Sequence, residues 1–145
     1  MKMKALYALL PFMLVSSACS AEALSDKVNA YFDAQKAVEH QHSKESDVTN
    51  LLMLLTPDAT FEHPRFNAIL SKEEYKAGLL SYLGQYTKCD IQVTNIIEGL
   101  NAVTVEYLHP CVDQQGNTNE KENKQKLVTL FEFSGEKIKR IRHYF

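Results

Sequence analysis

The sequence has no excess of basic residues and, after its first residues, no long apolar segment. It carries 16 Lys and Arg against 18 Asp and Glu, which gives a formal net charge of −2. This balance argues against nucleic acid or an anionic membrane as a partner, because both favour a basic face. Beyond Val15 no segment approaches the roughly 20 apolar residues of a membrane-spanning helix, so we expect no membrane span.

Closely spaced metal ligands are also missing from the sequence. It contains 3 Cys and 5 His, but no Cys-x-x-Cys motif and no histidines at the spacing of a zinc site. We therefore expect neither a metal nor a cofactor.

The N-terminus has the layout of a bacterial secretory signal, which we assign to residues 1–21. A basic start at Lys2 precedes an apolar run and a small-residue end. Cleavage after Ala21 would release a periplasmic or secreted protein, which is our prediction. Cleavage before Cys19 is the alternative and would produce an outer-membrane lipoprotein, although Ser16 stands where lipoprotein signals usually have an apolar residue.

The remainder, residues 24–145, is long enough for one domain around a single core. Apolar residues at helical spacing predict three helices, over residues 25–42, 47–55 and 71–83. The residues expected to be buried are Val28, Tyr31, Phe32 and Val38 in the first helix, and Tyr75, Leu79, Leu80 and Leu83 in the third. Their expected N-terminal caps are Ser25 with Asp26, Asp47, and the capping box Ser71-Lys72-Glu73-Glu74. A short strand over residues 60–63, stopped by Pro64, separates the second helix from the third.

From Cys89 onward apolar and polar residues alternate, which predicts two β-hairpins. The first turns at residues 99–101, with Ile97 on the buried face and Ile96 on the outer face. This register sets Cys89 opposite Cys111. Facing cysteines form a stable disulfide in an oxidising compartment, so we predict that bond; two unpaired cysteines in a slipped register are the alternative.

The second hairpin spans residues 127–145 and turns at residues 134–136. In its last strand Ile138 and Ile141 break the strict alternation, which indicates a bulge. The stretch between the hairpins, residues 112–123, is polar and predicts a solvated loop.

This order of elements resembles the nuclear-transport-factor-2-like superfamily, which includes SnoaL-like polyketide cyclases, ketosteroid isomerase and scytalone dehydratase. The motifs that carry the resemblance are Pro-Asp-Ala-Thr-Phe-Glu at 57–62 and Phe-Glu-Phe-Ser-Gly-Glu-Lys-Ile at 131–138. The resemblance covers residues 24–145. It implies an α+β cone, with three N-terminal helices packed on the concave face of a curved antiparallel β-sheet around a largely apolar pocket.

Ketosteroid isomerase is the family member that is most similar in local pattern. Its Glu-Asp-Pro motif, in which the aspartate is the general base, matches Glu62-His63-Pro64. Its first-helix tyrosine, which donates to the developing oxyanion, matches Tyr31, and its second donor, a protonated aspartate, matches Thr129. The resemblance thus implies His63 as base and Tyr31 as donor. Histidine, with an ordinary pKa of about 6.5, suits proton abstraction near neutral pH.

Further side chains are expected on the pocket wall. Tyr75 and Tyr82 lie on the third predicted helix, and His109 and His143 share the apolar face of their strands. The full set of predicted ligand-binding residues is Phe61, Tyr75, Tyr82, Tyr107, His109, Thr129 and His143. For His63 the alternative is a solvated loop residue, and for Tyr31 a residue of the core.

The sequence supports three functions. The first is an exported domain that binds a small, largely apolar molecule without chemistry. The second is a lyase or isomerase that catalyses proton transfer, dehydration or cyclisation, with His63 as general base and Tyr31 as oxyanion donor. The third is a protein-interaction module or homodimer that uses the outer face of the sheet. Whether the protein is an enzyme is not decided by these residues.

Overall fold

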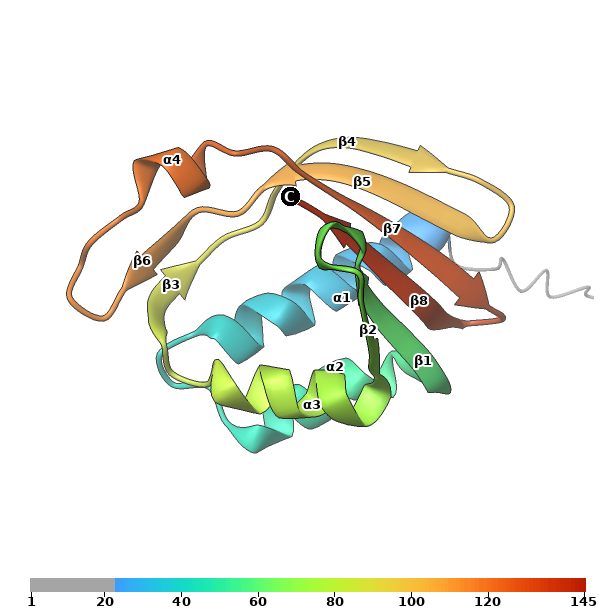
Figure 1. The fold of residues 1–145 in the computed structure, drawn as a ribbon, viewed down its shortest axis with the longest axis horizontal. Helices are drawn as coiled ribbons and strands as arrows, with labels where there is room; N and C mark the ends of the chain where they lie inside the picture. The colour runs from blue at the N-terminus through green and yellow to red at the C-terminus, as the bar shows by residue number, and fades with distance from the viewer. Residues whose placement is uncertain (1–22) are drawn as a thin grey trace, which may run out of the picture.

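Three helices lie on one side of a curved six-stranded sheet in the computed structural model, which describes residues 23–145 (Figure 1). The helices are α1 (Leu24–Glu39), α2 (Glu45–Met53) and α3 (Lys72–Ser81). This is the predicted fold class, an α+β cone with helices on the concave face of the sheet. No described helix has the length and apolarity to cross a membrane. The predicted leader, with Cys19, lies outside the described residues.

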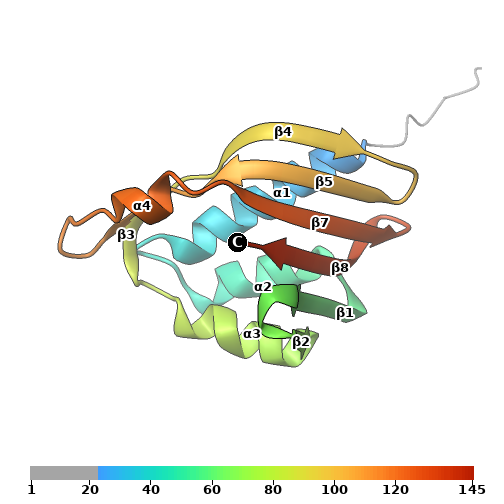
Figure 2. The same ribbon diagram turned by 45° about the horizontal axis from the view of Figure 1, so that its top comes forward.

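The six-stranded sheet has the order β2-β1-β8-β7-β5-β4. Its strands are β1 (Leu55–His63), β2 (Ala68–Ser71), β4 (Gln92–Glu98), β5 (Ala102–Leu108), β7 (Leu127–Ser134) and β8 (Lys137–Tyr144). Neighbours are antiparallel except β1 and β8, which pair in parallel. A separate ribbon extends the first hairpin beyond this sheet and consists of β3 (Tyr86–Cys89) and β6 (Cys111–Asp113) (Figure 2).

Helix α1 buries the expected stripe and differs from the prediction at both ends. Its buried residues are the four predicted ones, Val28, Tyr31, Phe32 and Val38. Ala23 is the N-cap, so the predicted caps Ser25 and Asp26 lie inside the first turn. The helix ends before His40, whose backbone is extended, rather than at His42.

Helix α2 has the predicted length but begins and ends two residues earlier, because the chain enters the sheet at Leu55. Asp47 lies in the first turn instead of at the N-cap, and its carboxylate accepts a hydrogen bond from the Lys44 backbone N–H at 2.7 Å. Leu55 was predicted in the helix but begins β1, where it pairs with Ile138. The Ile138 N–H also donates to the Leu54 carbonyl at 3.0 Å. Sheet pairing therefore overrides the local helical pattern.

Helix α3 begins at the predicted capping box. The Ser71 hydroxyl accepts the Glu74 N–H at 3.2 Å, and the Glu74 carboxylate accepts the Ser71 N–H at 2.7 Å. Two of the four expected core residues, Tyr75 and Leu79, are buried. The other two, Leu80 and Leu83, are half-buried.

Two short parts of the chain have more regular structure than predicted. Strand β2 precedes α3, and the expected loop over residues 112–123 contains most of β6 and the short helix α4 (Glu120–Asn123). Elements of three or four residues show too few alternations or helical turns for a sequence pattern to indicate them.

A bulge in β4 changes the register of the first hairpin. Glu98 faces Val103, whereas a three-residue turn would have paired it with Ala102. Because a shift of one residue inverts the two faces of a strand, Ile96 packs against the core and Ile97 is 63% exposed. The predicted positions of these two isoleucines were therefore wrong.

The disulfide prediction is confirmed although the turn beside it differs. The register shifts between Val93 and Asn95, so the expected pairing returns farther from the turn. Cys89 faces Cys111 with Cα atoms 4.2 Å apart, and the two are joined by a disulfide.

The predicted bulge in the second hairpin is also confirmed. The register between β7 and β8 shifts between Glu132 and Phe133. Ile138 and Ile141, which break the alternation, are both buried as a result. Gly135 in the turn has a φ of 58°, a conformation that glycine adopts at little cost.

Candidate functional site

A cavity of about 900 Å³ lies between the helices and the concave face of the sheet. Helices α1 and α3 contribute one wall, and strands β1, β5, β7 and β8 contribute the other. The β3–β6 ribbon and the polar segment of residues 117–125, which contains α4, also line it. All nine predicted catalytic and ligand-binding residues line it, namely Tyr31, Phe61, His63, Tyr75, Tyr82, Tyr107, His109, Thr129 and His143. The fold brings these residues together, while the role of each stays a prediction.

Two buried tyrosines form a hydroxyl pair in the wall. Tyr31 on α1 and Tyr75 on α3 place their hydroxyl oxygens 2.5 Å apart. Tyr75 also stacks on Phe61, with ring centroids separated by 4.2 Å. Burial raises the pKa of both tyrosines, and the proximity of Tyr75 adds to the rise for Tyr31. Both are therefore protonated at neutral pH, and the pair can donate one hydrogen to a ligand oxygen.

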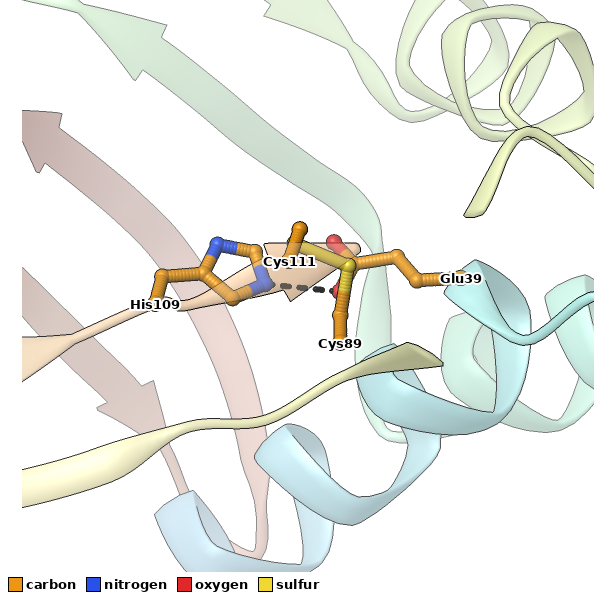
Figure 3. A group of neighbouring side chains, drawn as sticks. All are labelled: Glu39, Cys89, His109 and Cys111. Carbon is orange, nitrogen blue, oxygen red and sulfur yellow. Dashed lines mark hydrogen bonds and ion pairs between the residues drawn. A yellow bond between two sulfur atoms is a disulfide. The ribbon is translucent and has the colours of Figure 1, made fainter. Parts of the chain in front are cut away.

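A carboxylate that was not predicted lies beside His109. Glu39, the last residue of α1, places Oε2 2.8 Å from Nε2 of His109 (Figure 3). Gln35, one turn earlier, donates to the other carboxylate oxygen at 3.0 Å. The available signal was helical spacing, because Glu39 continues the face that carries Phe32 and Gln35. The Glu39 carboxylate makes this the charged end of the cavity.

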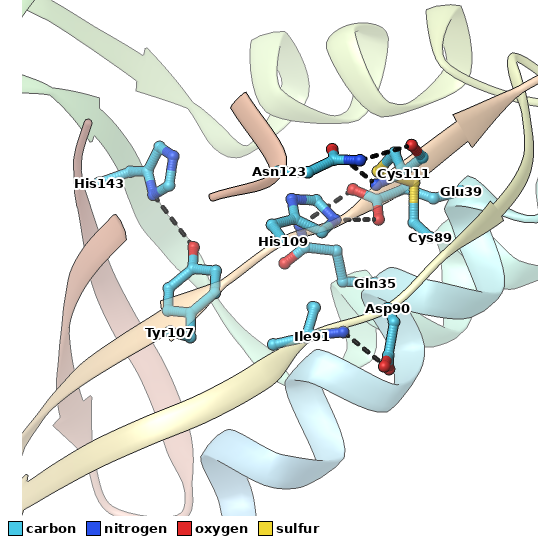
Figure 4. A network of polar contacts seen from close by, with 10 residues as sticks. All are labelled: Gln35, Glu39, Cys89, Asp90, Ile91, Tyr107, His109, Cys111, Asn123 and His143. Atoms are coloured by element: carbon cyan, nitrogen blue, oxygen red, sulfur yellow. Dashed lines mark hydrogen bonds and ion pairs between the residues drawn. A yellow bond between two sulfur atoms is a disulfide. The ribbon is translucent and has the colours of Figure 1, made fainter. Parts of the chain in front are cut away.

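At the other end three polar groups satisfy one another. Nδ1 of His143 lies 2.9 Å from Oγ1 of Thr129. It also lies 3.3 Å from the Tyr107 hydroxyl (Figure 4). Burial lowers the pKa of His143 to about 4, and the nearby His63 and His109 add to this shift. Burial likewise raises the pKa of Tyr107 to about 12. His143 is thus neutral, and Thr129, which matches the second oxyanion donor, is engaged within this triangle.

His63 has a buried ring nitrogen that lacks a partner. It ends β1 because Pro64 has no N–H with which to continue the pairing. Its ring centroid lies 4.9 Å from that of Phe61, 5.5 Å from that of His143 and 5.3 Å from that of Phe145. Burial lowers the pKa of His63, so the ring is neutral at neutral pH. Nδ1 has no hydrogen-bond partner among the described residues.

Exposed aromatic side chains also line the cavity. Tyr82 is 49% exposed and Phe145 is 36% exposed, and both belong to its wall. Phe66, with its ring centroid 5.5 Å from that of Phe145, lies beside them. Phe145 was not among the predicted site residues, although its parity with His143 along the last strand was an available signal. The C-terminus of the chain therefore contributes directly to the cavity.

The arrangement separates three kinds of polar group along an apolar surface. The hydroxyl pair of Tyr31 and Tyr75 can donate, the ring of His63 offers a nitrogen that can accept or donate a hydrogen according to its tautomer, and Glu39 with His109 carries charge.

Solved structures of low sequence identity have the same fold. A protein with a ketosteroid isomerase-like fold from Catenulispora acidiphila, in complex with trimethylamine, has a TM-score of 0.64 and 16% identity over 83% of this chain and 85% of that chain. TerC, co-crystallised with polyporic acid, has a TM-score of 0.62 and 16% identity over 83% and 89%. An NTF-2-like protein of unknown function from Burkholderia xenovorans has a TM-score of 0.59 and 17% identity over 84% and 81%.

Among curated proteins none matches the sequence significantly. The SnoaL-like domain family matches residues 28–141, which include every predicted pocket residue except His143. Members of this group bind small molecules or act as polyketide cyclases and isomerases. The chain therefore belongs to the SnoaL-like domain family, and its fold is the nuclear-transport-factor-2-like cone that the sequence resemblance implied.

Proposed function

We propose that the protein binds a small, largely apolar molecule in the cone cavity. The observation that carries this proposal is a cavity of about 900 Å³ whose lining brings together aromatic side chains, the Tyr31–Tyr75 hydroxyl pair and the neutral ring of His63. Small-molecule sites are typically cavities of about 300–1,000 Å³ with apolar walls and a few polar groups that orient the ligand. This cavity has the size, the aromatic lining and the polar groups of such a site.

The unpartnered nitrogen indicates what the ligand supplies. A buried polar atom without a hydrogen bond costs about 1–3 kcal/mol. A ligand hydroxyl could donate to the unprotonated nitrogen of the His63 ring once the ring turns toward the cavity, or a carbonyl could accept from the protonated one. The hydroxyls of Tyr31 and Tyr75 offer a second polar contact. The complexes of similar folds with trimethylamine and with polyporic acid support small-molecule binding in general.

Native mass spectrometry of the protein purified from its own source tests this proposal. We expect a co-purifying small molecule that is lost from a His63→Phe variant, because the larger apolar ring fills the space and removes the nitrogen. A His42→Phe variant is the matched control, since His42 is exposed outside the cavity. Wild-type protein that carries no molecule, and takes up none from an organic extract of the same cells, would contradict the proposal.

A second candidate function is proton transfer on a carbonyl compound. His63 and Tyr31 line one cavity, which favours this chemistry. The neutral His63 ring can remove a proton from the carbon next to a carbonyl, while Tyr31, hydrogen-bonded to Tyr75, donates to the enolate oxygen. The protonated His63 then returns the proton to another carbon in an isomerisation, or to a leaving hydroxyl in a dehydration.

Exchange of α-protons for deuterium in 2-tetralone, followed by NMR in D₂O, tests this chemistry with a small apolar ketone. Removal of a general base typically lowers the rate by about 10²–10⁴, so we expect a loss of that order for His63→Ala. Tyr31→Phe should lower it by about 10²–10³. Exchange at the wild-type rate in His63→Ala, with His42→Ala as the control, would eliminate His63 as the base.

We infer that the protein is exported. The predicted leader and the disulfide support this location, because disulfides persist in oxidising compartments. Cell fractionation tests it, and a cytoplasmic protein with an intact N-terminus would contradict it. The intact mass also separates cleavage after Ala21 from a lipid on Cys19. The homodimer through the outer face of the sheet stays a prediction.

A further inference from the structure

Four potential metal ligands from separate parts of the chain meet beside the cavity. They are Glu39 at the end of α1, Cys89 at the end of β3, His109 after β5 and Cys111 at the start of β6 (Figure 3). One ligand atom of each lies within 4.8 Å of those of the other three. Proton transfer at His63 does not use this group, and of its four members only His109 is a predicted ligand-binding residue. Its composition, with two sulfurs, one imidazole and one carboxylate, is suitable for zinc.

We propose that reduction of the Cys89–Cys111 disulfide opens a four-coordinate zinc site formed by Glu39, Cys89, His109 and Cys111. In the oxidised protein the sulfurs are bonded to each other, and only the carboxylate and the imidazole are available as ligands. Two ligands hold zinc weakly, whereas two thiolates with an imidazole and a carboxylate form a closed tetrahedral set. Whether the Cys89–Cys111 bond is oxidised or reduced thus determines whether the zinc site exists.

The distances require only small movements of the ligand atoms. Zinc binds sulfur at about 2.3 Å and imidazole or carboxylate atoms at about 2.0–2.2 Å, so neighbouring ligands in a tetrahedron lie about 3.3–3.8 Å apart. Oε2 of Glu39 and Nε2 of His109 must widen from 2.8 Å toward this range. The sulfurs separate once their bond is broken, and rotation of the two cysteine side chains suffices for this.

Contacts other than the disulfide hold the two cysteine backbones face to face. In the β3–β6 ribbon Lys88 also pairs with Val112. The side-chain amide of Asn123 accepts the Cys111 N–H at 3.1 Å and donates to the Cys111 carbonyl at 3.2 Å (Figure 4). The Asp90 N–H donates to the carbonyl of Pro110 at 3.0 Å. After reduction, the two thiols therefore still face each other beside Glu39 and His109.

The site has supporting contacts and an entry path. Metal-binding carboxylates are usually oriented by a further hydrogen bond, and Gln35 provides one to Oε1 of Glu39 at 3.0 Å. Glu39, His109 and Cys111 all line the cavity, which gives a reductant and a metal ion access to them. Oε2 of Glu39 is the carboxylate oxygen that faces the remaining ligands.

The chemistry balances with an external thiol as reductant. Two thiols give two electrons and two protons to the disulfide, which yields the thiols of Cys89 and Cys111 and one external disulfide. Binding of Zn²⁺ then releases both cysteine thiol protons, because the thiolate is the ligand. His109 binds through Nε2 as the neutral tautomer that carries its hydrogen on Nδ1, and Glu39 binds as the carboxylate.

Titration with Co²⁺ tests the proposal, because thiolate ligation to cobalt produces a charge-transfer band in the near ultraviolet. The wild-type protein is compared before and after reduction with a phosphine, which does not itself supply a thiol ligand. We expect the reduced protein to show the band, saturating with a single Co²⁺ ion, and Zn²⁺ to abolish it. The oxidised protein should show no such band. Circular dichroism records whether the reduced protein keeps its fold.

The variants separate this site from binding by loose thiols. His109→Asn in the reduced protein should weaken cobalt binding by at least about tenfold, since a ligand is lost. His42→Asn is the control and should bind as the wild type does, because His42 lies outside the group. Three results would overturn the proposal: no charge-transfer band in the reduced protein, equal affinity of the two histidine variants, or loss of the fold on reduction.

Discussion

The two ends of the cavity use histidine in different ways. His63 and His143 lie among aromatic rings, and burial lowers the pKa of both. His109 instead faces the carboxylate of Glu39 at 2.8 Å beside a disulfide. Because burial disfavours a charge, His63 and His143 are suited to neutral chemistry, whereas His109 contacts a carboxylate and two sulfur atoms lie close by.

The supports of the two ends differ as well. His143 is held from within the sheet, where Thr129, Tyr107 and Ile141 are buried. The Glu39–His109 pair lies where the small β3–β6 ribbon meets the end of α1, and a covalent bond joins that ribbon. Packing within the sheet thus maintains the neutral end of the cavity, which holds His63 and His143. The disulfide, which depends on redox conditions, contributes to the charged end, which holds Glu39 and His109.

Of the changes that test this comparison, removal of the disulfide should have the largest effect on the free energy of unfolding. Cys89 and Cys111 are separated by 22 positions, and closing a loop of that length stabilises a protein by about 3 kcal/mol in the chain-entropy description. We expect the Cys89→Ala, Cys111→Ala double variant to lose about 3 kcal/mol of unfolding free energy in urea titrations. A loss below about 1 kcal/mol would show that packing, not the bond, supports the charged end.

Acidification should have the second-largest effect on stability, through His143 at the neutral end of the cavity. The pKa of His143 is about 4 in the folded protein and about 6.5 in an unfolded chain, so the unfolded state binds more protons below pH 6.5. The stabilisation by neutral His143 is complete above that pH and decreases as the pH falls toward 4. Its contribution between pH 7 and pH 5 is about 2 kcal/mol.

Urea titrations across this pH range measure the effect in pairs of variants. His143→Asn should have a flatter dependence of unfolding free energy on pH than the wild type, since the group that takes up the proton is gone. His42→Asn, changed at an exposed position, should keep the wild-type slope. Equal slopes in all three proteins would show that His143 is not held neutral by burial.

Loss of the hydroxyl pair of Tyr31 and Tyr75 should have a smaller effect on stability, and the effects of the two single changes should not be additive. Tyr31→Phe leaves the buried Tyr75 hydroxyl without its partner at 2.5 Å, which should cost about 1–3 kcal/mol. The Tyr31→Phe, Tyr75→Phe double variant should lose less than the sum of the two single changes, because no unpaired hydroxyl remains. Thermal unfolding of the four proteins gives the coupling, and strict additivity would argue against a direct bond.

The Glu39–His109 pair predicts the smallest change in stability. The two side chains are 14% and 20% exposed, and glutamine at position 39 would still accept a hydrogen bond from His109. We expect Glu39→Gln to change the unfolding free energy by less than about 1 kcal/mol. A loss of several kcal/mol in urea titration would mean that this end is as dependent on buried contacts as the His63 end.

Local signals predicted several elements correctly. The capping box of Ser71 with Glu74 is a short-range pattern, and it is observed at the start of α3. The broken alternation at Ile138 and Ile141 indicated the bulge in β8, since only a bulge allows both to be buried. The disulfide followed from the strand pairing expected near Cys89, which the bulge in β4 restores after the different pairing beside the turn.

Pairing between distant segments could not be predicted in the same way. The bulge in β4 inverted Ile96 and Ile97, because nothing in that strand marks where one extra residue is accommodated. Leu55 entered β1 rather than α2 through its pairing with Ile138. Glu39 became part of the site only because the end of α1 meets the segment that follows β5.

The sequence by itself determined the period of most segments, the capping box of α3 and the apolar faces of α1 and α3, because these depend on neighbours a few residues away. It also indicated the cone through a family resemblance, and nine of the residues that line its cavity. Only the tertiary structure decided which polar groups meet inside the cavity. It left Nδ1 of His63 without a partner, enclosed His143 with Thr129, and placed Glu39 beside His109 and the disulfide. The physical reason is that hydrogen bonds and ion pairs act over a few ångströms, so the chemistry of these side chains depends on contacts between strands and helices far apart in the sequence.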